Sequence, residues 1–562
     1  MSAPLRHRPR EGGFVAVWLA IMATILIVTV GFAVDLGNWK LTGGRAQGAA
    51  EAAALAGVTF LPDDPATAEA IARQVALDHG YDPADPDITV SVSLGAGPTQ
   101  LEVEISQRVD NLFTAVVGIN STTVTRSAVA EFAPPVEIGS PDPIMGNDPE
   151  SGHQPDFWLS QAGQQVEKDQ GDRYSTFWCA VATTYECSGW SGNNEFNGGS
   201  YNYVARVSDA TQPLRIQLFD PIWAWVGSDC SFPFWPTAAE IADLQADALT
   251  NPDIPDTYYD DAAVRYAGGN DEWCTGDDYP NLGAPGMNMS VGVYAPDDTP
   301  WTDNDNPFVG YGCWVTFNGT EVMSPYTLPI PSVYELLSSR VGGDTEWQVR
   351  ADGVPTFAET FRRWYTVCDL PAAATVEGDY IIKVFTDSSG GQNRFSLRSG
   401  PPQGAGISDV GQSAFAREGF PIYANADGAN TEFFLARVPP GVTDRILRLT
   451  FFDIGDASNP GKVQVLPPDD ANVVHFDDCT FTRSDGVAVV PGINCQINNV
   501  SRASGYNGTL VEVEVLIPAS YDCDHLDPDG CWVKVVADFG GGVTDFTTWT
   551  AEIDGDSVRL VG

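Results

Sequence analysis

The sequence predicts a multidomain fold: an N-terminal transmembrane helix, a small α+β domain, and then two mainly-β antiparallel sandwich domains that carry disulfides. Three observations lead to this prediction. An uncharged apolar run occupies residues 14–34, an alanine-rich helical pattern follows it, and from about residue 155 the chain switches to short runs of alternating apolar and polar residues. All ten cysteines lie in that last part. With 562 residues, the chain is long enough for three or four domains.

The apolar run from Phe14 to Val34 is long enough to cross a membrane. Its 21 uncharged residues, at about 1.5 Å of rise each, match the roughly 30 Å hydrocarbon core of a bilayer. Three arginines precede the run, and basic residues that flank a span stay on the cytoplasmic side. We therefore predict a cytoplasmic basic tail at 1–13, with the rest of the chain beyond the membrane. A cleaved signal peptide is the alternative, but it would have a shorter apolar region followed by a cleavage site with small residues.

The composition excludes one class of partner. The chain has 29 Lys and Arg against 75 Asp and Glu, which gives a net charge of −46. Such a surface repels phosphate backbones, so we expect no nucleic-acid partner. Hydrophobic residues make up 43% of the chain and charged residues only 19%, so the acidic groups belong to folded domains and not to a disordered chain.

A small α+β domain is predicted at 35–133. Its first part is rich in alanine, so we expect the membrane helix to continue as far as Gly57. A second helix is expected between Asp64 and Gly80. Alternating polarity predicts the three strands, and a short helix is expected near 112–117. The expected strands cover 88–94, 101–105 and 122–132.

Small residues line one face of the continued helix, and a proline-rich segment follows the α+β domain. The face would accept either another helix or the chain's own next domain. It comprises Gly48, Ala49, Ala52, Ala53 and Ala56. The polar, proline-rich segment at 134–154 is predicted to be a linker.

These N-terminal features resemble TadE-like and TadG-like proteins of the tight-adherence (Flp) pilus assembly systems of bacteria. The resemblance covers only the N-terminal region. It is carried by the uncharged span followed by an anchor motif, whose residues are Asp35, Gly37, Gln47, Ala49 and Ala50. It implies a bacterial cell membrane location and pilus assembly or secretion proteins as partners. Two residues depart from the pattern: Glu51 replaces the usual aspartate, and Trp18 stands where a processed pilin has glutamate, which favours a retained anchor.

Three pairs of similar segments, in the same order, indicate a duplication after residue 154. The segments at 201–220, 291–298 and 378–386 match those at 432–453, 463–470 and 530–538. Alternating runs divided by Gly, Pro, Asn and Asp are typical of antiparallel sandwich strands. We predict a first β-sandwich repeat at 155–401, with an insertion at 221–288, and a second at 403–562.

The cysteines predict disulfides and not a metal site. An even number of cysteines on the outer side of a membrane is typical of oxidised pairs. The chain has no C-x-x-C pair and its five histidines are scattered, which disfavours zinc. Neighbours in the sequence suggest five pairs: Cys179–Cys187, Cys230–Cys274, Cys313–Cys368, Cys479–Cys495 and Cys523–Cys531.

Acidic loops offer candidates for structural calcium, since Ca²⁺ takes oxygen ligands from carboxylates and carbonyls. The candidates are Asp303 with Asp305, and Asp453 with Asp456. Neither pair fits an EF-hand loop, and solvated turns are the competing interpretation. We expect no other cofactor. The sequence contains no G-x-S-x-G, P-loop or H-E-x-x-H motif, so we predict no enzymatic activity.

Two functions remain open from the sequence. The first is a non-enzymatic, membrane-anchored component of a Flp pilus or secretion assembly, with an extracellular β-sandwich ectodomain. The second is a surface adhesin or carbohydrate-binding protein that uses the same kind of anchor and binds surface glycans or matrix. Exposed aromatic residues could stack on sugar rings, although such residues more often fill a core; the candidates are Trp223, Trp225, Phe232, Phe234 and Trp235.

Overall fold

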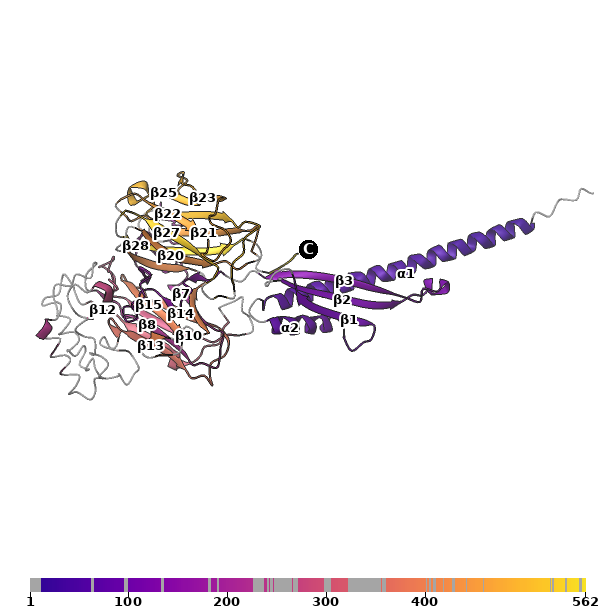
Figure 1. Ribbon diagram of the computed structural model, residues 1–562, viewed down its shortest axis with the longest axis horizontal. Coiled ribbons are helices and arrows are strands. Elements are labelled where there is room, and N and C mark those ends of the chain that lie inside the picture. Colours follow the sequence, from indigo (N-terminus) through magenta and orange to yellow (C-terminus); the bar gives the residue numbers. More distant parts are fainter. Residues whose placement is uncertain are drawn as a thin grey trace, which may run out of the picture. The chain divides into compact units, whose positions relative to one another are not determined.

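The computed structural model divides the chain into two compact units (Figure 1). The first comprises Met1–Pro134 and Gly555–Gly562, and the second comprises Pro135–Asp554. The structure describes residues 12–561, apart from most of 226–270 and 322–359 and from short segments at 62–64, 96–99, 133–135, 180–182, 190–191, 298–304, 418, 427–429, 441, 458, 541–542, 555–557 and parts of 401–410 and 526–529.

One continuous helix, α1 (Gly12–Val58), opens the first unit and includes the whole apolar run. The predicted end at Gly57 is therefore correct to within one residue. The predicted tail at 1–13 lies almost wholly outside the described residues. Helix α2 (Pro65–Asp78) follows, and its proline occupies the first helical position, where no backbone N–H is needed.

A four-stranded antiparallel sheet completes the first unit, in the order β1-β2-β3-β29 among the described residues. The strands are β1 (Ile88–Leu94), β2 (Gln100–Asp110), β3 (Ser121–Phe132) and β29 (Val558–Leu560), and the short 3-10 helix η1 (Thr114–Val117) lies between β2 and β3. The last strand corrects the predicted second repeat at 403–562: Val558 pairs with Phe132, so the chain end returns to the N-terminal sheet. Three residues give too little periodicity to reveal that pairing.

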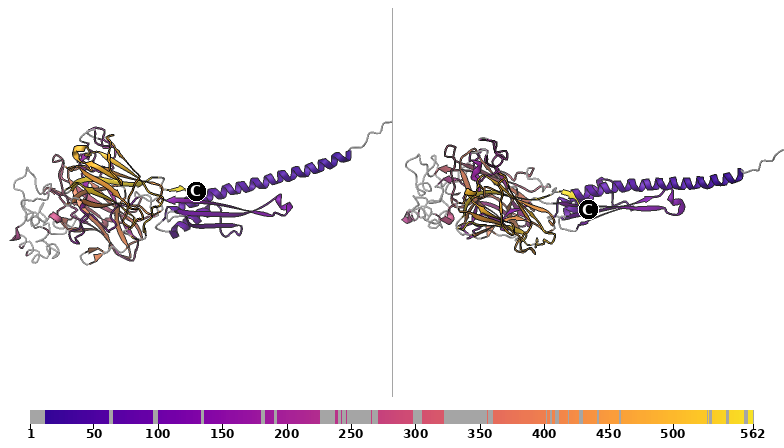
Figure 2. Two further views of the ribbon diagram at one scale, coloured as in Figure 1. Left: turned by 45° about the horizontal axis from the view of Figure 1, so that its top comes forward. Right: turned by 90° about the horizontal axis from the view of Figure 1, so that it is seen from above.

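The C-terminal part of α1 lies along this sheet, as Figure 2 shows in two views. Ala46, Ala49, Ala50 and Ala53 are buried in one core with α2 and the strands. A Cβ atom on Gly57 would lie 2.5 Å from the Ala68 carbonyl oxygen, so only glycine allows this close approach to α2. Of the predicted small-residue face, Ala49 and Ala53 are buried in the chain's own domain, Ala52 and Ala56 are half-buried, and Gly48 is exposed.

Two large antiparallel sheets form the second unit. Among the described residues, the first has eleven strands: β11 (Trp314–Asn318), β10 (Asn288–Tyr294), β14 (Gly378–Thr386), β7 (Ser200–Val207), β18 (Gln412–Ala416), β4 (Ile138–Gly139), β20 (Asn430–Arg437), β27 (Trp532–Asp538), β22 (Gly461–Leu466), β25 (Gln496–Val500) and β24 (Val490–Pro491). They are given in spatial order.

The second sheet has ten described strands. In spatial order, nine of them are β13 (Trp364–Leu370), β8 (Leu214–Phe219), β15 (Gln392–Gly400), β6 (Phe157–Ala162), β19 (Phe420–Ala426), β28 (Val543–Ile553), β21 (Ile446–Phe452), β26 (Leu510–Leu516) and β23 (Cys479–Arg483), while β5 (Ile144–Met145) pairs with β15 beside them. Apolar side chains from both sheets form one buried core, as expected for a sandwich. Two small pairs, β9 (Ala224–Trp225) with β12 (Thr320–Glu321) and β16 (Pro402–Gln403) with β17 (Gly406–Ile407), complete the described strands.

The two predicted repeats share both sheets and form one compact unit. Strand β18 of the second repeat pairs with β7 of the first, and β19 pairs with β6. The boundary between 401 and 403 is therefore not a boundary between folded units. The predicted linker at 134–154 is also corrected, because β4 pairs with both β18 and β20 at the centre of a sheet. Its apolar residues Ile138 and Met145 are buried in the core.

Strands from the matched sequence segments occupy corresponding places in each sheet. In the eleven-stranded sheet, β10-β14-β7 on one side of the centre correspond to β22-β27-β20 on the other. In the second sheet, β8 and β21 lie symmetrically about the central pair β6 and β19. Two copies of one duplicated sandwich half, joined edge to edge, would produce this arrangement. The predicted insertion at 221–288 lies largely outside the described residues.

Four of the predicted disulfides are present and confirm the pairing of neighbours in the sequence. They are Cys179–Cys187, Cys313–Cys368, Cys479–Cys495 and Cys523–Cys531. Cys274 is also disulfide-bonded, but Cys230, its predicted partner, lies outside the described residues. Each bridge stabilises such a domain by about 2–4 kcal/mol.

Ion pairs hold the seam between the halves. Asp379 on β14 accepts hydrogen bonds from Arg206 on β7, at 2.7 and 3.0 Å, and from Arg417. Burial alone would raise the pKa of Asp379, but the two arginines outweigh it and lower this pKa to about 2. Glu137, just before β4, pairs with Arg206 and with Arg437 on β20, so charges bind the first repeat to the second.

Candidate functional site

The N-terminal half of α1 exposes an unbroken apolar surface. Its large side chains from Phe14 to Val34 are all exposed, and Phe14 is 71% accessible. Among the described residues, this is the helix long and apolar enough to span a membrane. A helix that is apolar on every side is typical of a membrane-spanning segment, and we call residues 14–34 the anchor.

Asp35, the first charged residue after the anchor, ties α1 to the turn between β2 and β3. Its carboxylate is buried and accepts three backbone N–H hydrogen bonds, from Leu112 at 3.0 Å, Phe113 at 3.0 Å and Thr114 at 2.7 Å. These donors belong to the start of η1, which would otherwise leave them without partners. A carboxylate at this one place of α1 therefore fixes the turn against the end of the anchor.

Two further contacts position the same turn. A Cβ atom on Gly31 would lie 2.7 Å from the Phe113 ring, so only glycine lets this ring lie against the helix. Trp39 donates its indole N–H to the Asn111 side chain at 2.8 Å. Figure 1 shows the turn beside α1, at the boundary between the apolar run and the part that packs on the sheet.

The turn carries apolar side chains that its own domain does not cover. They are Leu112, Phe113, Val116 and Ile119, and Val116 is 86% exposed. Because Phe113 contacts Gly31, which lies inside the apolar run, these side chains lie level with the last turn of the anchor. The sequence predicts the short helix here, but it contains no signal that places this helix beside the anchor.

The other residues of the predicted anchor motif have structural roles of different kinds. Gln47 donates to the Glu51 carboxylate at 2.9 Å and to the Ser127 carbonyl oxygen on β3 at 3.2 Å. Ala49 and Ala50 are buried against the chain's own sheet. Gly37 is exposed, and a Cβ atom there would meet nothing within 4 Å. Nothing in the structure explains the glycine at this position.

Gly37 is part of an open face of α1, opposite the buried alanines. Gly37, Leu41, Gly44 and Gly48 follow one another at helical spacing, and all four are exposed. Added Cβ atoms on the three glycines would meet nothing within 4 Å among the described residues. This face, which we call the open helix face, allows the close approach of another helix.

A comparison with protein families identifies the anchor region. Residues 13–67 match the family described as "Putative Flp pilus-assembly TadE/G-like". The N-terminal segment is therefore TadE/G-like. The match includes the apolar run, Asp35 and the open helix face of this TadE/G-like segment, and it ends within the first turn of α2. No curated protein and no solved structure matches the chain.

The predicted calcium candidates differ in their surroundings. Asp303 lies outside the described residues, and Asp305 is exposed. Asp453, at the end of β21, has 0% of its surface exposed and a backbone φ of 63°. One of its oxygens, Oδ1, accepts the Gly508 N–H at 2.8 Å, while Oδ2 is buried without a hydrogen-bond partner. Asp456 likewise has a buried Oδ1 with no partner.

Two more carboxylates lie near this pair, and the sequence does not point to them. Asp545 on β28 is 6% exposed, and Asp169 lies in the 3-10 helix η2 (Lys168–Gln170). Burial and the neighbouring carboxylates raise the pKa of Asp453 well above its usual value, with Asp456, Asp545 and Asp169 each contributing. Asp545 is 92 residues beyond Asp453, so no local spacing connects the two.

Another acidic grouping has a different explanation. Among the described residues, Asp470, Cys523 and Cys531 bring their ligand atoms within 4.8 Å of one another. The two cysteines are bonded to each other, so neither offers a thiolate to a metal. Asp470 instead accepts the backbone N–H groups of Asp524 and Cys531, at 2.8 and 3.0 Å, and holds this disulfide loop in place.

Of the aromatic residues suggested for sugar binding, Trp223 and Trp225 lie in a core or against it, and Phe232, Phe234 and Trp235 lie outside the described residues. Trp223 is 1% exposed and packs edge-on against Tyr279, and Trp225 contacts the same ring. An exposed aromatic group occurs instead beside the edge strand β11. Phe308 contacts Tyr311 and Trp314 with ring centroids 5.7 and 6.1 Å apart, and Tyr311 is 91% exposed. We call these three residues the aromatic edge.

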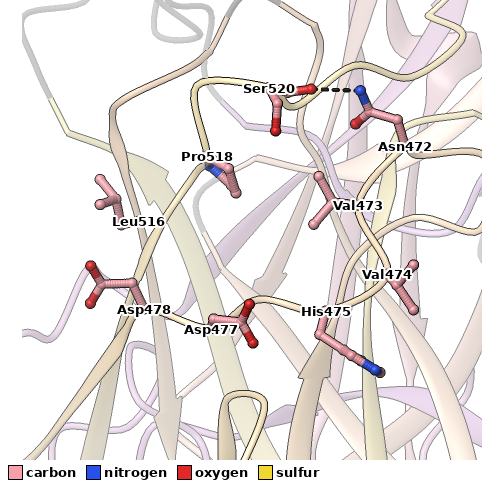
Figure 3. Close-up of a pocket in the computed structure, with 9 residues that line it drawn as sticks. All are labelled: Asn472, Val473, Val474, His475, Asp477, Asp478, Leu516, Pro518 and Ser520. Atoms are coloured by element: carbon pink, nitrogen blue, oxygen red, sulfur yellow. Dashed lines mark hydrogen bonds between the residues drawn. The ribbon is translucent and has the colours of Figure 1, made fainter.

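A shallow hollow of about 510 Å³ lies beside β23 (Figure 3). Its lining combines the apolar side chains of Val473, Val474 and Leu516 with the acidic side chains of Asp477 and Asp478. Asn472 bridges one rim to the Ser520 carbonyl oxygen at 2.6 Å. The hollow contains no convergent set of polar groups of the kind that binds a small ligand.

Proposed function

We propose that this protein is a non-enzymatic, membrane-anchored component of a Flp pilus or secretion assembly. The observation that carries the proposal is the TadE/G-like match over 13–67, together with the Asp35 carboxylate that ties the anchor to the folded domain. A rigid connection of this kind would transmit position and force between a membrane-embedded machine and an outer domain. The sandwich unit would then present its surface to other envelope proteins.

In this proposal the N-terminus is cytoplasmic and the disulfide-bonded sandwich lies outside the membrane. The arginines before the anchor and the disulfides beyond it both support that orientation. Leu112 and Val116 on the turn beside Gly31 would then enter the outer interface of the membrane. A short apolar turn beside the span would limit how far the helix tilts or slides.

The open helix face is where we expect the partner helices of the assembly to bind. A photoreactive residue at Leu41 should form crosslinks in intact cells to proteins of the pilus machinery. The same residue at Ala49, which is buried against the chain's own sheet, is the matched control and should give at least about tenfold less intermolecular product. Mass spectrometry of the captured bands would identify the partners. Equal capture at the two positions, or capture of unrelated membrane proteins only, would contradict the proposal.

Sugar binding by the ectodomain is the second candidate function, and the aromatic edge favours it. Exposed rings of Tyr311 and Trp314 present flat apolar faces of the kind that stack on sugar rings. If they bind sugars, the full chain in detergent should be retained on polysaccharide resins, and Tyr311→Ala with Trp314→Ala should abolish retention. Trp178→Ala, at another partly exposed tryptophan, should leave retention unchanged. Unchanged retention in the double variant would exclude this site.

A further inference from the structure

We propose that Asp169, Asp453, Asp456 and Asp545, with the Thr184 hydroxyl, form a Ca²⁺ site that joins the two halves of the sandwich. This carboxylate cluster lies where β21 ends, next to the segment before β26. The proposal is independent of the pilus function, since it concerns only the second unit.

Five side-chain oxygens in this cluster are buried without a hydrogen-bond partner. They are Asp169 Oδ1, Thr184 Oγ1, Asp453 Oδ2, Asp456 Oδ1 and Asp545 Oδ1. Buried polar atoms are normally satisfied, so five such oxygens from one small region point to a ligand that accepts lone pairs. Each of these atoms can ligate a hard cation, so one bound cation would satisfy all five of them.

Gly508 shows how the members meet. Its N–H donates to Asp453 at 2.8 Å, and a Cβ atom placed on it would lie 3.2 Å from the Thr184 hydroxyl and 3.3 Å from the Asp169 Cβ. Burial is the main cause that raises the pKa of both Asp456 and Asp545; Asp169 raises that of Asp456 further, against the opposing effect of Arg502, and Asp456 raises that of Asp545. The cluster therefore combines residues that are almost 400 positions apart in the sequence.

The protein itself supplies little positive charge to this cluster. None of the four carboxylates forms an ion pair within 4.0 Å among the described residues, and the nearest cation by electrostatic effect is the exposed Arg502, which lowers the pKa of Asp169 and Asp456. Several buried negative charges without counter-charges are strongly unfavourable. A divalent cation would neutralise them.

The first repeat provides an internal comparison. Asp220 ends its matched segment just as Asp453 ends the other, and both have positive φ, 49° and 63°. Both oxygens of Asp220 are satisfied, by the Arg362 N–H at 3.0 Å and the Thr275 hydroxyl at 3.0 Å. Asp172 is buried and lies close to Asp169 in the sequence. Its carboxylate oxygens also have partners, since they accept hydrogen bonds from three backbone N–H groups and the Tyr201 hydroxyl. Carboxylate oxygens without hydrogen-bond partners are therefore a feature of this cluster, since the buried Asp220 and Asp172 do have partners.

The ligand set favours Ca²⁺ over other cations. All five groups are oxygens, so soft metals are disfavoured. Mg²⁺ requires a regular octahedron and retains waters, whereas Ca²⁺ accepts six to eight irregularly placed oxygens, carbonyls included. No three of these carboxylates bring oxygens within 4.8 Å of one another as they stand, so binding would draw the side chains together. Removal of Ca²⁺ should therefore loosen this part of the sandwich.

The test uses the full chain in detergent micelles, with thermal unfolding followed in EDTA and in Ca²⁺. Ca²⁺ at about a hundred times its dissociation constant should raise the unfolding midpoint by ~3–5 °C, and Tb³⁺ should bind at the same site with luminescence sensitised by nearby aromatic rings. Asp456→Asn, at a partly exposed position where folding should survive, and Asp545→Asn should each weaken Ca²⁺ binding at least tenfold. Asp477→Asn removes the same charge from an exposed position and should leave binding unchanged.

Three results would overturn the proposal. The first is an unfolding midpoint that does not change between EDTA and 5 mM Ca²⁺, which is well above the roughly 1 mM needed by weak extracellular sites. The second is a Ca²⁺ effect that persists unchanged in both Asp456→Asn and Asp545→Asn, which would place the ion elsewhere. The third is stabilisation by Mg²⁺ and not by Ca²⁺. None of these results bears on crosslinking at Leu41, so the Ca²⁺ site and the pilus function are tested independently.

Discussion

Met22→Arg combined with Ile25→Arg should release the protein from the membrane. Both residues lie near the middle of the anchor, and both are exposed on α1. An arginine at the centre of a membrane helix costs about 2.5–3.5 kcal/mol on insertion scales, so two should lower the equilibrium constant for insertion by more than about a thousandfold. The measurement is the distribution of the chain between the membrane and soluble fractions after carbonate extraction.

The matched control for this double variant is Leu41→Arg with Leu77→Arg. It adds the same two charges at exposed leucines of the first unit, beyond the apolar run. This control should remain in the membrane fraction. If the anchor variant also remained there, the apolar half of α1 would not be what holds the protein in the membrane.

Glu195→Ala should cause the largest loss of stability in the sandwich unit. Glu195 accepts hydrogen bonds from the buried Lys168 amine at 2.7 Å and from the Arg173 guanidinium at 2.7 and 3.1 Å. Lys168 is fully buried, and the Tyr185 and Phe452 rings lie 5.5 and 5.4 Å from its amine. Removing the carboxylate leaves two buried cations without their partner, which costs about 3–5 kcal/mol.

Urea unfolding of the full chain in micelles measures this loss, and Glu552→Ala is the control. Glu552 forms the same kind of pair with Arg448 but is 63% exposed, so its removal should change the free energy of unfolding by no more than about 1 kcal/mol. An equally small change for Glu195→Ala would contradict the prediction. Glu195→Gln should give an intermediate loss, because the amide oxygen can still accept hydrogen bonds.

The same ion pairs predict how stability depends on pH. Burial opposes ionisation of Glu195, but Arg173 and Lys168 outweigh it and lower the pKa of Glu195 below its usual 4.5. A carboxyl group with a lowered folded-state pKa stabilises the protein above the unfolded-state pKa and loses that contribution as the pH falls. The free energy of unfolding should therefore decrease below about pH 4.5, and this part of the decrease should be absent in Glu195→Gln.

The apolar helix, strands β1 to β3 and the disulfides between cysteines close in sequence could be predicted because their signals are local. An uncharged run of 21 residues, alternation over 88–94 and cysteines 8 positions apart each specify structure within one segment. The same holds for the end of α1 near Gly57. The resemblance to TadE/G-like proteins likewise depends on one continuous segment, and the family comparison over 13–67 supports it.

The carboxylate cluster could be predicted only in part. Asp453 and Asp456 were suggested because they lie close together in sequence at the end of a strand. Asp169 and Asp545 gave no such signal: the pairing of β28 with β21 brings Asp545 near the end of β21, and Asp169 comes from a 3-10 helix far away in the sequence. The aromatic edge was missed for a similar reason: composition does not distinguish an aromatic ring that fills a core, as Trp223 does, from one such as Tyr311 that faces solvent.

The sequence by itself determined that this protein has an apolar helix able to enter a membrane, a small α+β domain and an oxidised β-rich remainder, because periodicity, charge and neighbouring cysteines act within a few residues of one another. Only the tertiary structure decided that the two repeats share their sheets, that the last strand returns to the first domain, that Asp35 holds the turn beside the anchor, and that four aspartates meet. These features depend on pairing between distant segments. The contacts that stabilise such pairing join residues far apart in the sequence, so no local sequence pattern predicts them.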